Sequence, residues 1–158
     1  MFTNLGGVFR CLRCGADTDA LIQTYLFKTT AENAGEVYRV GEGAEVDGIE
    51  EFIPLYPWDG RAPLEVAVGD WDCGKCRLNW QWAKLTLTLD GSKGTILALT
   101  TFLPKDASDF NGIHRLQRDL ADLAGEKSSS EVLPPGERAV RIAAGFKTWC
   151  REVAGVEP

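Results

Sequence analysis

The sequence of 158 residues lacks the motifs that mark the commonest enzyme classes. It contains no P-loop, Rossmann glycine pattern, G-x-S-x-G elbow or H-E-x-x-H helix, and it has a single histidine. No apolar run approaches the length of a membrane span. Residues 1–10 have neither the basic start nor the apolar core of a secretion signal. These absences leave no recognised catalytic motif, and they predict a cytoplasmic protein that does not enter a membrane.

Basic residues are scarce in one part of the chain. Residues 31–72 carry eleven acidic and two basic side chains, a net charge of −9, whereas the other residues carry +3, which together give −6. Such a segment repels phosphate backbones and attracts a basic protein surface. Nucleic acid is therefore disfavoured as a general partner. The alternative is that these charges are simply solvated, as charged segments usually are.

What the sequence does contain fits one soluble domain, residues 1–158. Its hydrophobic fraction is 44% and its charged fraction 25%, which is typical of a globular chain, and its length is sufficient for a continuous core. We expect residues 1–30 and 73–103 to form a β core. Residues 31–72 are then an acidic insertion, and residues 104–158 a helical part.

Alternating and β-branched residues predict the strands. Residues 21–27 form one such run, and residues 36–40 and 64–68 form shorter ones. The clearest pattern is a hairpin over residues 85–103, in which leucines alternate with threonines and residues 90–94 turn the chain.

After residue 103 the hydrophobic period changes from two to 3.6, which predicts helices. The stripe of the first helix is Ile113, Leu116, Leu120 and Leu123. His114 lies off this stripe and is expected to be exposed. Residues 126–136 predict a loop, and residues 137–154 a last helix with the buried stripe Ala139, Ile142, Ala143, Phe146, Cys150 and Val153. Strands followed by helices predict an α+β fold, with two C-terminal helices packed on an antiparallel β-sheet.

Four of the five cysteines form two Cys-x₂-Cys pairs, Cys11 with Cys14 and Cys73 with Cys76. Zinc takes four ligands in a tetrahedron, and the two-residue spacing lets both sulfurs of a pair face one ion. Gly15 and Gly74 allow tight turns at the pairs. We therefore expect the four cysteines to bind one Zn²⁺. A closed four-sulfur site has no open coordination position, so the ion would be structural.

The two pairs resemble the zinc knuckles of zinc-ribbon proteins, in which each pair lies at a β-turn. The resemblance covers only the pairs and the strands beside them, and it implies a zinc-ribbon-like β core. The spacer of 58 residues between Cys14 and Cys73 is far longer than in a compact ribbon. It implies a long insertion between the knuckles, and no individual ribbon family is identified. Four basic residues flank the ligands and are expected to stabilise the thiolates, namely Arg10, Arg13, Lys75 and Arg77.

Two other interpretations of the paired cysteines stay open. Disulfides need an oxidising compartment, which the missing secretion signal disfavours. A thioredoxin-like redox pair at residues 71–76 needs a helix that begins at the first cysteine, whereas the residues after Cys76 predict a strand. The fifth cysteine, Cys150, lies in the apolar stripe of the last helix and is expected in the core.

Trp80 and Trp82 are two residues apart on a predicted strand and should share a face, with Leu85, Leu87 and Leu89 on the other. Both faces would then carry large apolar groups. This favours a two-sided core, covered by helices on one side and by the cysteine loops on the other. The functional alternative is an aromatic platform that stacks a base or a sugar.

Residues 50–60 place aromatic side chains within the most acidic region. Pro54 and Pro57 stiffen this segment and prevent regular strand pairing. Rigid aromatics with a charged rim are typical of interface hot spots. The candidate partner-binding residues are Glu50, Glu51, Tyr56, Trp58 and Asp59. The alternative is an irregular segment folded over the sheet, which would bury the rings.

The leading hypothesis is a non-enzymatic, zinc-stabilised, acidic protein-binding module that engages a basic protein surface. An inhibitor such as an immunity protein, or an adaptor, would have these properties. A second hypothesis is a zinc-ribbon protein associated with nucleic acid, which would use the four flanking basic residues with Trp80 and Trp82. A third is an enzyme with an unrecognised acidic site.

Overall fold

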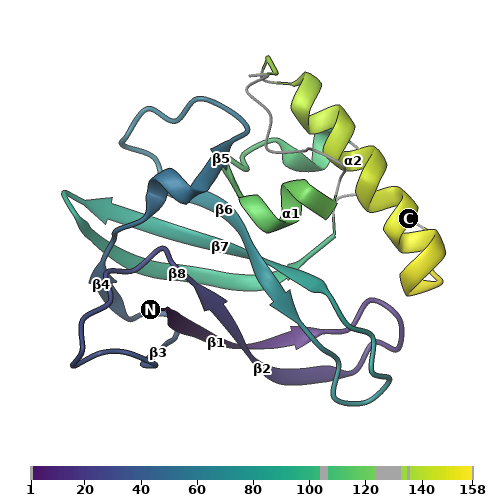
Figure 1. Cartoon of the computed structure of the whole chain (residues 1–158), viewed down its shortest axis with the longest axis horizontal. Coiled ribbons are helices and arrows are strands. Elements are labelled where there is room, and N and C mark those ends of the chain that lie inside the picture. The colour runs from purple at the N-terminus through teal and green to yellow at the C-terminus, as the bar shows by residue number, and fades with distance from the viewer. Residues whose placement is uncertain (1, 104–106, 124–132, 135, 158) are drawn as a thin grey trace.

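The computed structural model describes residues 2–103, 107–123, 133–134 and 136–157. Two β-sheets and a pair of helices form three layers (Figure 1). A three-stranded sheet packs on one face of a six-stranded sheet, and the helices cover the other face. The chain therefore has the predicted α+β character, but it contains two sheets in place of one.

The small sheet has the strand order β2-β1-β3. Its strands are β1 (Thr3–Arg10), β2 (Asp17–Thr24) and β3 (Val37–Tyr38). β1 and β2 are antiparallel along their whole length, whereas β3 is parallel to β1. The predicted strand over residues 21–27 is thus wrong in its bounds, because polar residues of an exposed edge strand extend it to Asp17. The run predicted at residues 36–40 is confirmed as β3.

The large sheet has the order β4-β8-β7-β6-β9-β5. Its strands are β4 (Gly43–Glu45), β5 (Phe52–Pro54), β6 (Leu64–Trp71), β7 (Gln81–Asp90), β8 (Lys93–Phe102) and β9 (Arg115–Gln117). β6 and β9 are parallel and the other neighbours are antiparallel, so the sheet is mixed and not purely antiparallel as predicted. Two short 3₁₀ helices, η1 (Ile49–Glu51) and η2 (Ala107–Phe110), connect strands. Residues 31–72 contribute strands to both sheets.

The hairpin formed by β7 and β8 is confirmed, with a tighter turn than predicted. Asp90 pairs with Lys93, so only Gly91 and Ser92 form the turn. Gly91 has a φ of 61°, which a residue without a side chain adopts at little cost.

Both faces of β7 are buried. Leu85 pairs with Leu99, and a Cβ added at Gly7 of β1 would lie 3.2 Å from the Leu99 side chain, so this face lies against the small sheet. On the opposite face, the Trp82 ring packs edge-on against two aromatic rings of α2 at centroid distances of 4.6 Å. The two-sided core is therefore confirmed, but the small sheet covers the face predicted to lie under the cysteine loops.

The first predicted helix is wrong over its first half. Residues 115–117 form β9, and only Arg118–Leu123 form a helix, α1. The amide of His114 donates to the carbonyl of Glu65, and the amide of Leu55 donates to the carbonyl of His114. These long-range bonds use backbone groups that a helix would need. Ile113, Leu116 and Leu120 are nevertheless buried, since one apolar spacing fits both arrangements.

The last helix is confirmed as α2 (Glu137–Trp149), which continues as a π-helical turn, η3 (Cys150–Ala154). Its predicted stripe is buried as far as Cys150. Val153 is 50% exposed and Ala154 is buried, so the prediction for Val153 is wrong. The wider π turn changes which side chain faces the core. Most of the predicted loop at residues 126–136 lies outside the described residues.

Among the described residues, no helix is long and apolar enough to cross a membrane.

Candidate metal centre

The two cysteine pairs lie in two turns at one end of the sheets. Cys11 and Cys14 are in the turn between β1 and β2, which we call the first cysteine turn. Cys73 and Cys76 follow β6 and form the second cysteine turn. The two turns face each other, and all four Sγ atoms lie within 4.8 Å of one another. The pairs that are 58 residues apart in the sequence therefore form one cluster.

The first cysteine turn is closed by backbone hydrogen bonds around Cys11. The amide of Gly15 donates to the Cys11 carbonyl at 3.0 Å, and the Cys11 amide donates to the carbonyl of Ala16 at 2.9 Å. The Arg13 amide points at the Cys11 Sγ atom at 3.4 Å. One sulfur thus accepts from the backbone of its own turn.

The second cysteine turn repeats these bonds at equivalent positions. The Arg77 amide donates to the Cys73 carbonyl at 3.1 Å, and the Cys73 amide donates to the Leu78 carbonyl at 3.0 Å. The amides of Lys75 and Cys76 both point at the Cys73 Sγ atom at 3.4 Å. Backbone amides aimed at sulfur favour the thiolate.

The residue after each pair has a left-handed backbone conformation. Gly15 follows the first pair with a φ of 71°, and Arg77 follows the second pair with a φ of 60°. The sequence predicted the glycine at the first turn. It did not indicate that an arginine adopts the same conformation at the second, where a side chain makes it unfavourable.

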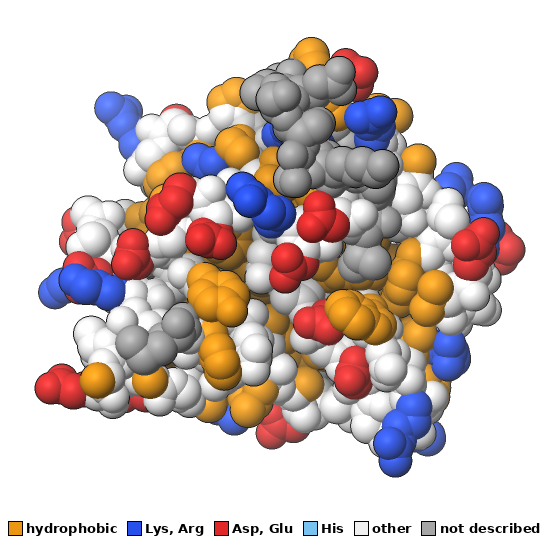
Figure 2. Space-filling view, viewed as in Figure 1, with side chains coloured by type: hydrophobic (Ala, Val, Ile, Leu, Met, Phe, Trp, Pro, Cys, Tyr) orange, Lys and Arg blue, Asp and Glu red, His pale blue; other side chains and the backbone are white. Residues whose placement is uncertain are grey.

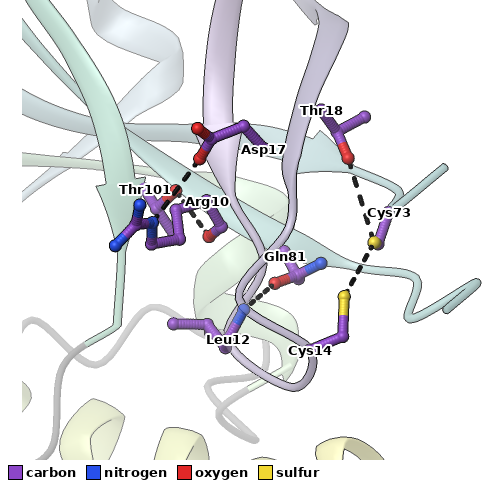
Figure 3. Close-up of polar contacts among 8 residues, drawn as sticks. All are labelled: Arg10, Leu12, Cys14, Asp17, Thr18, Cys73, Gln81 and Thr101. Carbon is purple, nitrogen blue, oxygen red and sulfur yellow. Dashed lines mark hydrogen bonds and ion pairs between the residues drawn. The ribbon is translucent and has the colours of Figure 1, made fainter. Parts of the chain in front are cut away.

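Gln81 joins the two turns and was missed from the sequence. It is fully buried. Its Oε1 atom accepts from the Leu12 amide at 2.9 Å (Figure 3). Its Nε2 atom donates to the Leu78 carbonyl at 3.2 Å. The same Nε2 atom lies 3.6 Å from the Cys11 Sγ atom. A buried glutamine needs partners, but its burial follows from the tertiary structure, so no sequence pattern pointed to this residue.

Thr18 forms a second link between the turns. From β2, its hydroxyl lies 3.8 Å from the Cys73 Sγ atom and accepts from the Gly74 amide at 3.3 Å. Figure 3 shows Thr18, Cys73 and Cys14 in a row, with Gln81 and Leu12 beside them. The cluster is therefore surrounded by polar contacts from both sheets.

All five cysteines are free thiols. The shortest sulfur–sulfur distances join one turn to the other: 3.5 Å between Cys11 and Cys76, and 3.6 Å between Cys14 and Cys73. These distances are far longer than a disulfide bond of about 2.05 Å. No helix begins at Cys73, as a thioredoxin-like pair would need, because the chain after it turns and enters β7.

The two thiols of the second turn differ in acidity. The amide of Cys76 is the largest cause that lowers the pKa of Cys73, to about 6, with help from the thiols of Cys14 and Cys11. The Leu78 amide lowers the pKa of Cys76, but desolvation and the hydrogen bonds with the other three thiols outweigh it and raise this pKa to about 11. Without a metal the cluster thus contains both a thiolate and a protonated thiol at neutral pH.

The flanking arginines have other partners than the sulfurs. Arg10 forms an exposed ion pair with Asp17 at 3.5 Å. The Arg13 guanidinium donates to the carbonyls of Ala154 and Val153, both at 2.9 Å, and so links the first cysteine turn to the C-terminal end of η3. The prediction that Arg13 serves mainly as a counter-charge did not foresee this link.

The two tryptophans near the second turn do not share a face. Trp82 is buried, whereas Trp80 is 54% exposed and precedes β7 with a φ of 64°. The predicted pairing is wrong because the chain leaves the turn in a left-handed conformation and enters the strand only at Gln81. The two rings therefore do not form a common stacking platform.

The candidate partner-binding residues lie in two places. Glu50 and Glu51 belong to η1 and line a surface cavity of about 230 Å³, which we call the acidic hollow; its other lining residues are Tyr25, Phe27, Thr29, Asp47 and Gly48. Trp58 donates from Nε1 to the Ala62 carbonyl at 2.8 Å, within its own turn. Asp59 accepts from the amides of Arg61 and Ala62, and these bonds lower its pKa.

The remaining single residues agree in part with the predictions. Tyr56 and Trp58 are partly buried against the core. Cys150 is buried, as expected. His114 is partly exposed but lies before β9 and not on a helix, with its Nδ1 atom 3.1 Å from the Pro57 carbonyl.

The chain matches no protein-family model, and neither curated proteins nor solved structures give a significant match to it. What the cluster can do follows from its chemistry. Four thiols at these distances can hold a metal ion.

Proposed function

We propose that the protein is a non-enzymatic binding module, that its four-cysteine cluster holds one structural Zn²⁺, and that its acidic face engages a basic protein surface. The observation that supports the metal is the closed set of four sulfurs. With a zinc–sulfur distance of about 2.3 Å, tetrahedral geometry gives sulfur–sulfur edges of about 3.8 Å. The distances of 3.5 and 3.6 Å between the turns are close to this value.

The surroundings of the cluster also fit a metal. Cys11 and Cys73 are buried and accept backbone N–H groups, while Gln81 and Thr18 reach the sulfurs from two strands. Such outer contacts orient the ligands and tune the metal site. Cys14 is exposed, so an ion can enter from solvent. Four sulfurs on Zn²⁺ leave no position for substrate, which makes the role structural.

Elemental analysis tests the metal directly. We expect one zinc per chain after purification without chelator, and four thiols that become reactive only after zinc is removed. Replacement of Cys14 by Ser should release the metal, whereas replacement of Cys150 by Ser should leave the zinc content at one. A protein that folds with no bound metal and four reactive thiols would contradict the proposal.

The acidic hollow supports the binding function. Its carboxylates come from Asp47, Glu50 and Glu51, and no basic side chain lines it. Tyr25 is 49% exposed at the same cavity, so a cation there can meet both carboxylates and a ring face. On the face shown in Figure 2, acidic side chains gather across the centre with hydrophobic ones between them, and most basic side chains lie toward the margins.

The hollow is held in a fixed shape. The amide of Asp47 donates to the carbonyl of Leu26 at 2.7 Å, and that of Lys28 to the carbonyl of Glu45 at 2.8 Å. A Cβ at Gly48 would lie 2.4 Å from the Tyr25 carbonyl oxygen, so only glycine allows the two segments to approach this closely. A preformed site loses less entropy when it binds.

Charge reversal tests the acidic face with the native partner, captured from cells that make the protein. Glu50→Lys with Glu51→Lys should slow association at least tenfold and weaken its salt dependence, because opposite charges steer encounter. The matched control reverses two exposed carboxylates elsewhere, Asp122→Lys with Glu157→Lys. Equal association rates for both double variants would show that the acidic hollow is not the interface.

The nucleic-acid alternative finds less support. It relied on Trp82, which is buried, and on Arg10 and Arg13, which have protein partners. Of the residues in that hypothesis, Lys75, Arg77 and Trp80 are exposed, and their side chains have no protein partner in the site described above. Binding to single-stranded nucleic acid at two salt concentrations distinguishes the cases, because phosphate contacts give a steep loss of affinity with salt.

A further inference from the structure

One arginine lies in the large sheet without a partner. Arg115 is the first residue of β9, between β5 and β6, and its side chain is partly buried. Its Nε atom is buried and has no hydrogen-bond partner. Among the described residues, the guanidinium forms neither a hydrogen bond nor an ion pair. The strands on both sides offer apolar neighbours, since Arg115 pairs with Pro54 and with Val66.

An arrangement of this kind is unfavourable for the protein alone. Arginine keeps its charge at any pH that a folded protein experiences, so it cannot avoid the cost by releasing its proton. Burial lowers the pKa of Arg115, which reflects the same cost. Buried charges are normally paired, because an unpaired one loses hydration without compensation. No described carboxylate pairs with the Arg115 guanidinium, so a ligand that carries a negative charge would compensate it better than water does.

A second donor lies on the same face of the strand. Gln117 is two residues after Arg115, so the pleat of β9 directs both side chains to one side of the sheet. The Gln117 Oε1 atom accepts from the amide of Gly69 at 2.8 Å, which fixes the orientation of its amide group. No described hydrogen bond occupies its Nε2 donor. Arg115 and Gln117 thus present donors on the same face of β9.

We propose that Arg115 and Gln117 form a binding site for an oxyanion, a carboxylate or phosphate group of a ligand. A guanidinium meets either group with two parallel hydrogen bonds, and its weak hydration suits a partly buried position. The amide of Gln117 supplies an additional bond to the same group. This site shares no residue with the cysteine cluster or with the acidic hollow. A negative result would therefore test the oxyanion site alone and leave the proposed zinc and the proposed partner surface standing.

NMR of the arginine Nε–Hε groups tests the site in the intact protein. Inorganic phosphate and, separately, acetate are titrated at constant pH and constant ionic strength, with chloride replaced. We expect the Arg115 signal to shift with a saturating curve. The signal of Arg118, three residues further on and exposed, is the internal control and should show no saturation. Saturation by both anions indicates that a carboxylate suffices, and saturation by phosphate alone indicates a phosphate-bearing ligand. No saturation with either overturns the proposal.

Thermal unfolding of two variants gives a second measurement. Arg115→Met should unfold at the same or a higher temperature in chloride, because it removes an unpaired charge, and it should lose the stabilisation that phosphate gives the wild type. Arg115→Lys keeps the charge but not the two parallel bonds, and it should bind phosphate about tenfold more weakly. If Arg115→Met instead unfolds at a lower temperature by the same amount with and without phosphate, Arg115 is structural and the proposal is wrong.

Discussion

The two cysteine turns make the same hydrogen bonds from unlike sequences. Gly15 closes the first turn and the chain then enters β2 directly. Arg77 closes the second, and a further left-handed residue, Trp80, precedes β7. Glycine adopts this conformation at little cost, whereas arginine and tryptophan do not. The first turn is therefore favoured by its own sequence, and the second depends more on what it contacts.

The two turns also differ in their hydrogen bonds to the rest of the fold. The first turn is tied to the rest of the fold through Arg13, which bonds to two carbonyls at the C-terminal end of η3. The second turn is bonded by Thr18 and Gln81, and Gln81 also accepts from the Leu12 amide of the first turn. We infer that the first turn forms readily and that the second is held in place by the sulfurs and by these two side chains. The predictions below test this difference.

Loss of the metal should have the largest effect. A structural zinc contributes on the order of 10 kcal/mol to folding, which is comparable to the stability of a whole domain. A chelator should therefore unfold most of the protein, and added Zn²⁺ should restore it, as monitored by circular dichroism. Hydrogen exchange at partial removal sharpens the comparison. Amides of residues 73–80 should lose protection before those of residues 11–16, and the reverse order would contradict the inference.

Removal of the bridging glutamine should have the next largest effect. Gln81→Leu leaves the Leu12 amide without its partner, whereas the Leu78 carbonyl keeps its bond from the Cys73 amide. One unsatisfied group costs about 1–3 kcal/mol, so we expect the free energy of unfolding to fall by about that amount. Urea denaturation with zinc present measures it. Gln23→Leu on the exposed side of β2 is the control and should change stability by less than about 0.5 kcal/mol. Equal effects would mean that Gln81 does not join the turns.

Metal affinity should depend on pH through the second turn. Cys76, with a pKa of about 11, is protonated at neutral pH and must release its proton to become a ligand. Its release makes the zinc affinity rise by about tenfold per pH unit. Cys73, with a pKa of about 6, is already a thiolate above that pH and releases no proton when zinc binds. Below that pH it is protonated and must release one more. Competition with a chelator should therefore show a slope that steepens by one proton below about pH 6. An unchanged slope would contradict the assignment of Cys73.

The ligands could be predicted from the sequence because their spacing is local chemistry. Two Cys-x₂-Cys pairs already require a turn that aims two sulfurs at one point. The strands and the last helix followed from periodicity for the same reason. By contrast, Gln81 and Thr18 each bond to the cysteine turn that is more than fifty residues away in the sequence, so no local pattern marks these contacts. Arg13 was assigned to the sulfurs because its bond to the C-terminal end depends on tertiary structure.

The errors in the fold have a similar origin. The apolar spacing of Ile113, Leu116 and Leu120 fits a helical stripe, yet it also fits a strand followed by a short helix. Residues 115–117 form a strand because they pair with β5 and β6. The spacing of apolar residues does not reveal such long-range pairing. Trp80 was placed on the wrong face because its left-handed conformation breaks the alternation of the strand. Strain of this kind, imposed by the neighbouring turn, is invisible to residue propensity.

Exchange of the left-handed residues should give the smallest effects, with opposite signs at the two turns. Gly15→Ala places a side chain at a φ of 71° with no other atom within 4 Å of the new Cβ, so its cost is conformational, about 1 kcal/mol. Arg77→Gly removes the conformational cost of a side chain at a φ of 60°, but glycine also adds entropy to the unfolded chain. The two contributions nearly cancel, so the variant should be more stable by only a few tenths of a kcal/mol. Urea denaturation of both variants with zinc bound measures the signs. A lower stability for Arg77→Gly would mean that the arginine side chain itself supports the second turn, and the difference between the turns would then lie in their side chains and not in their backbones.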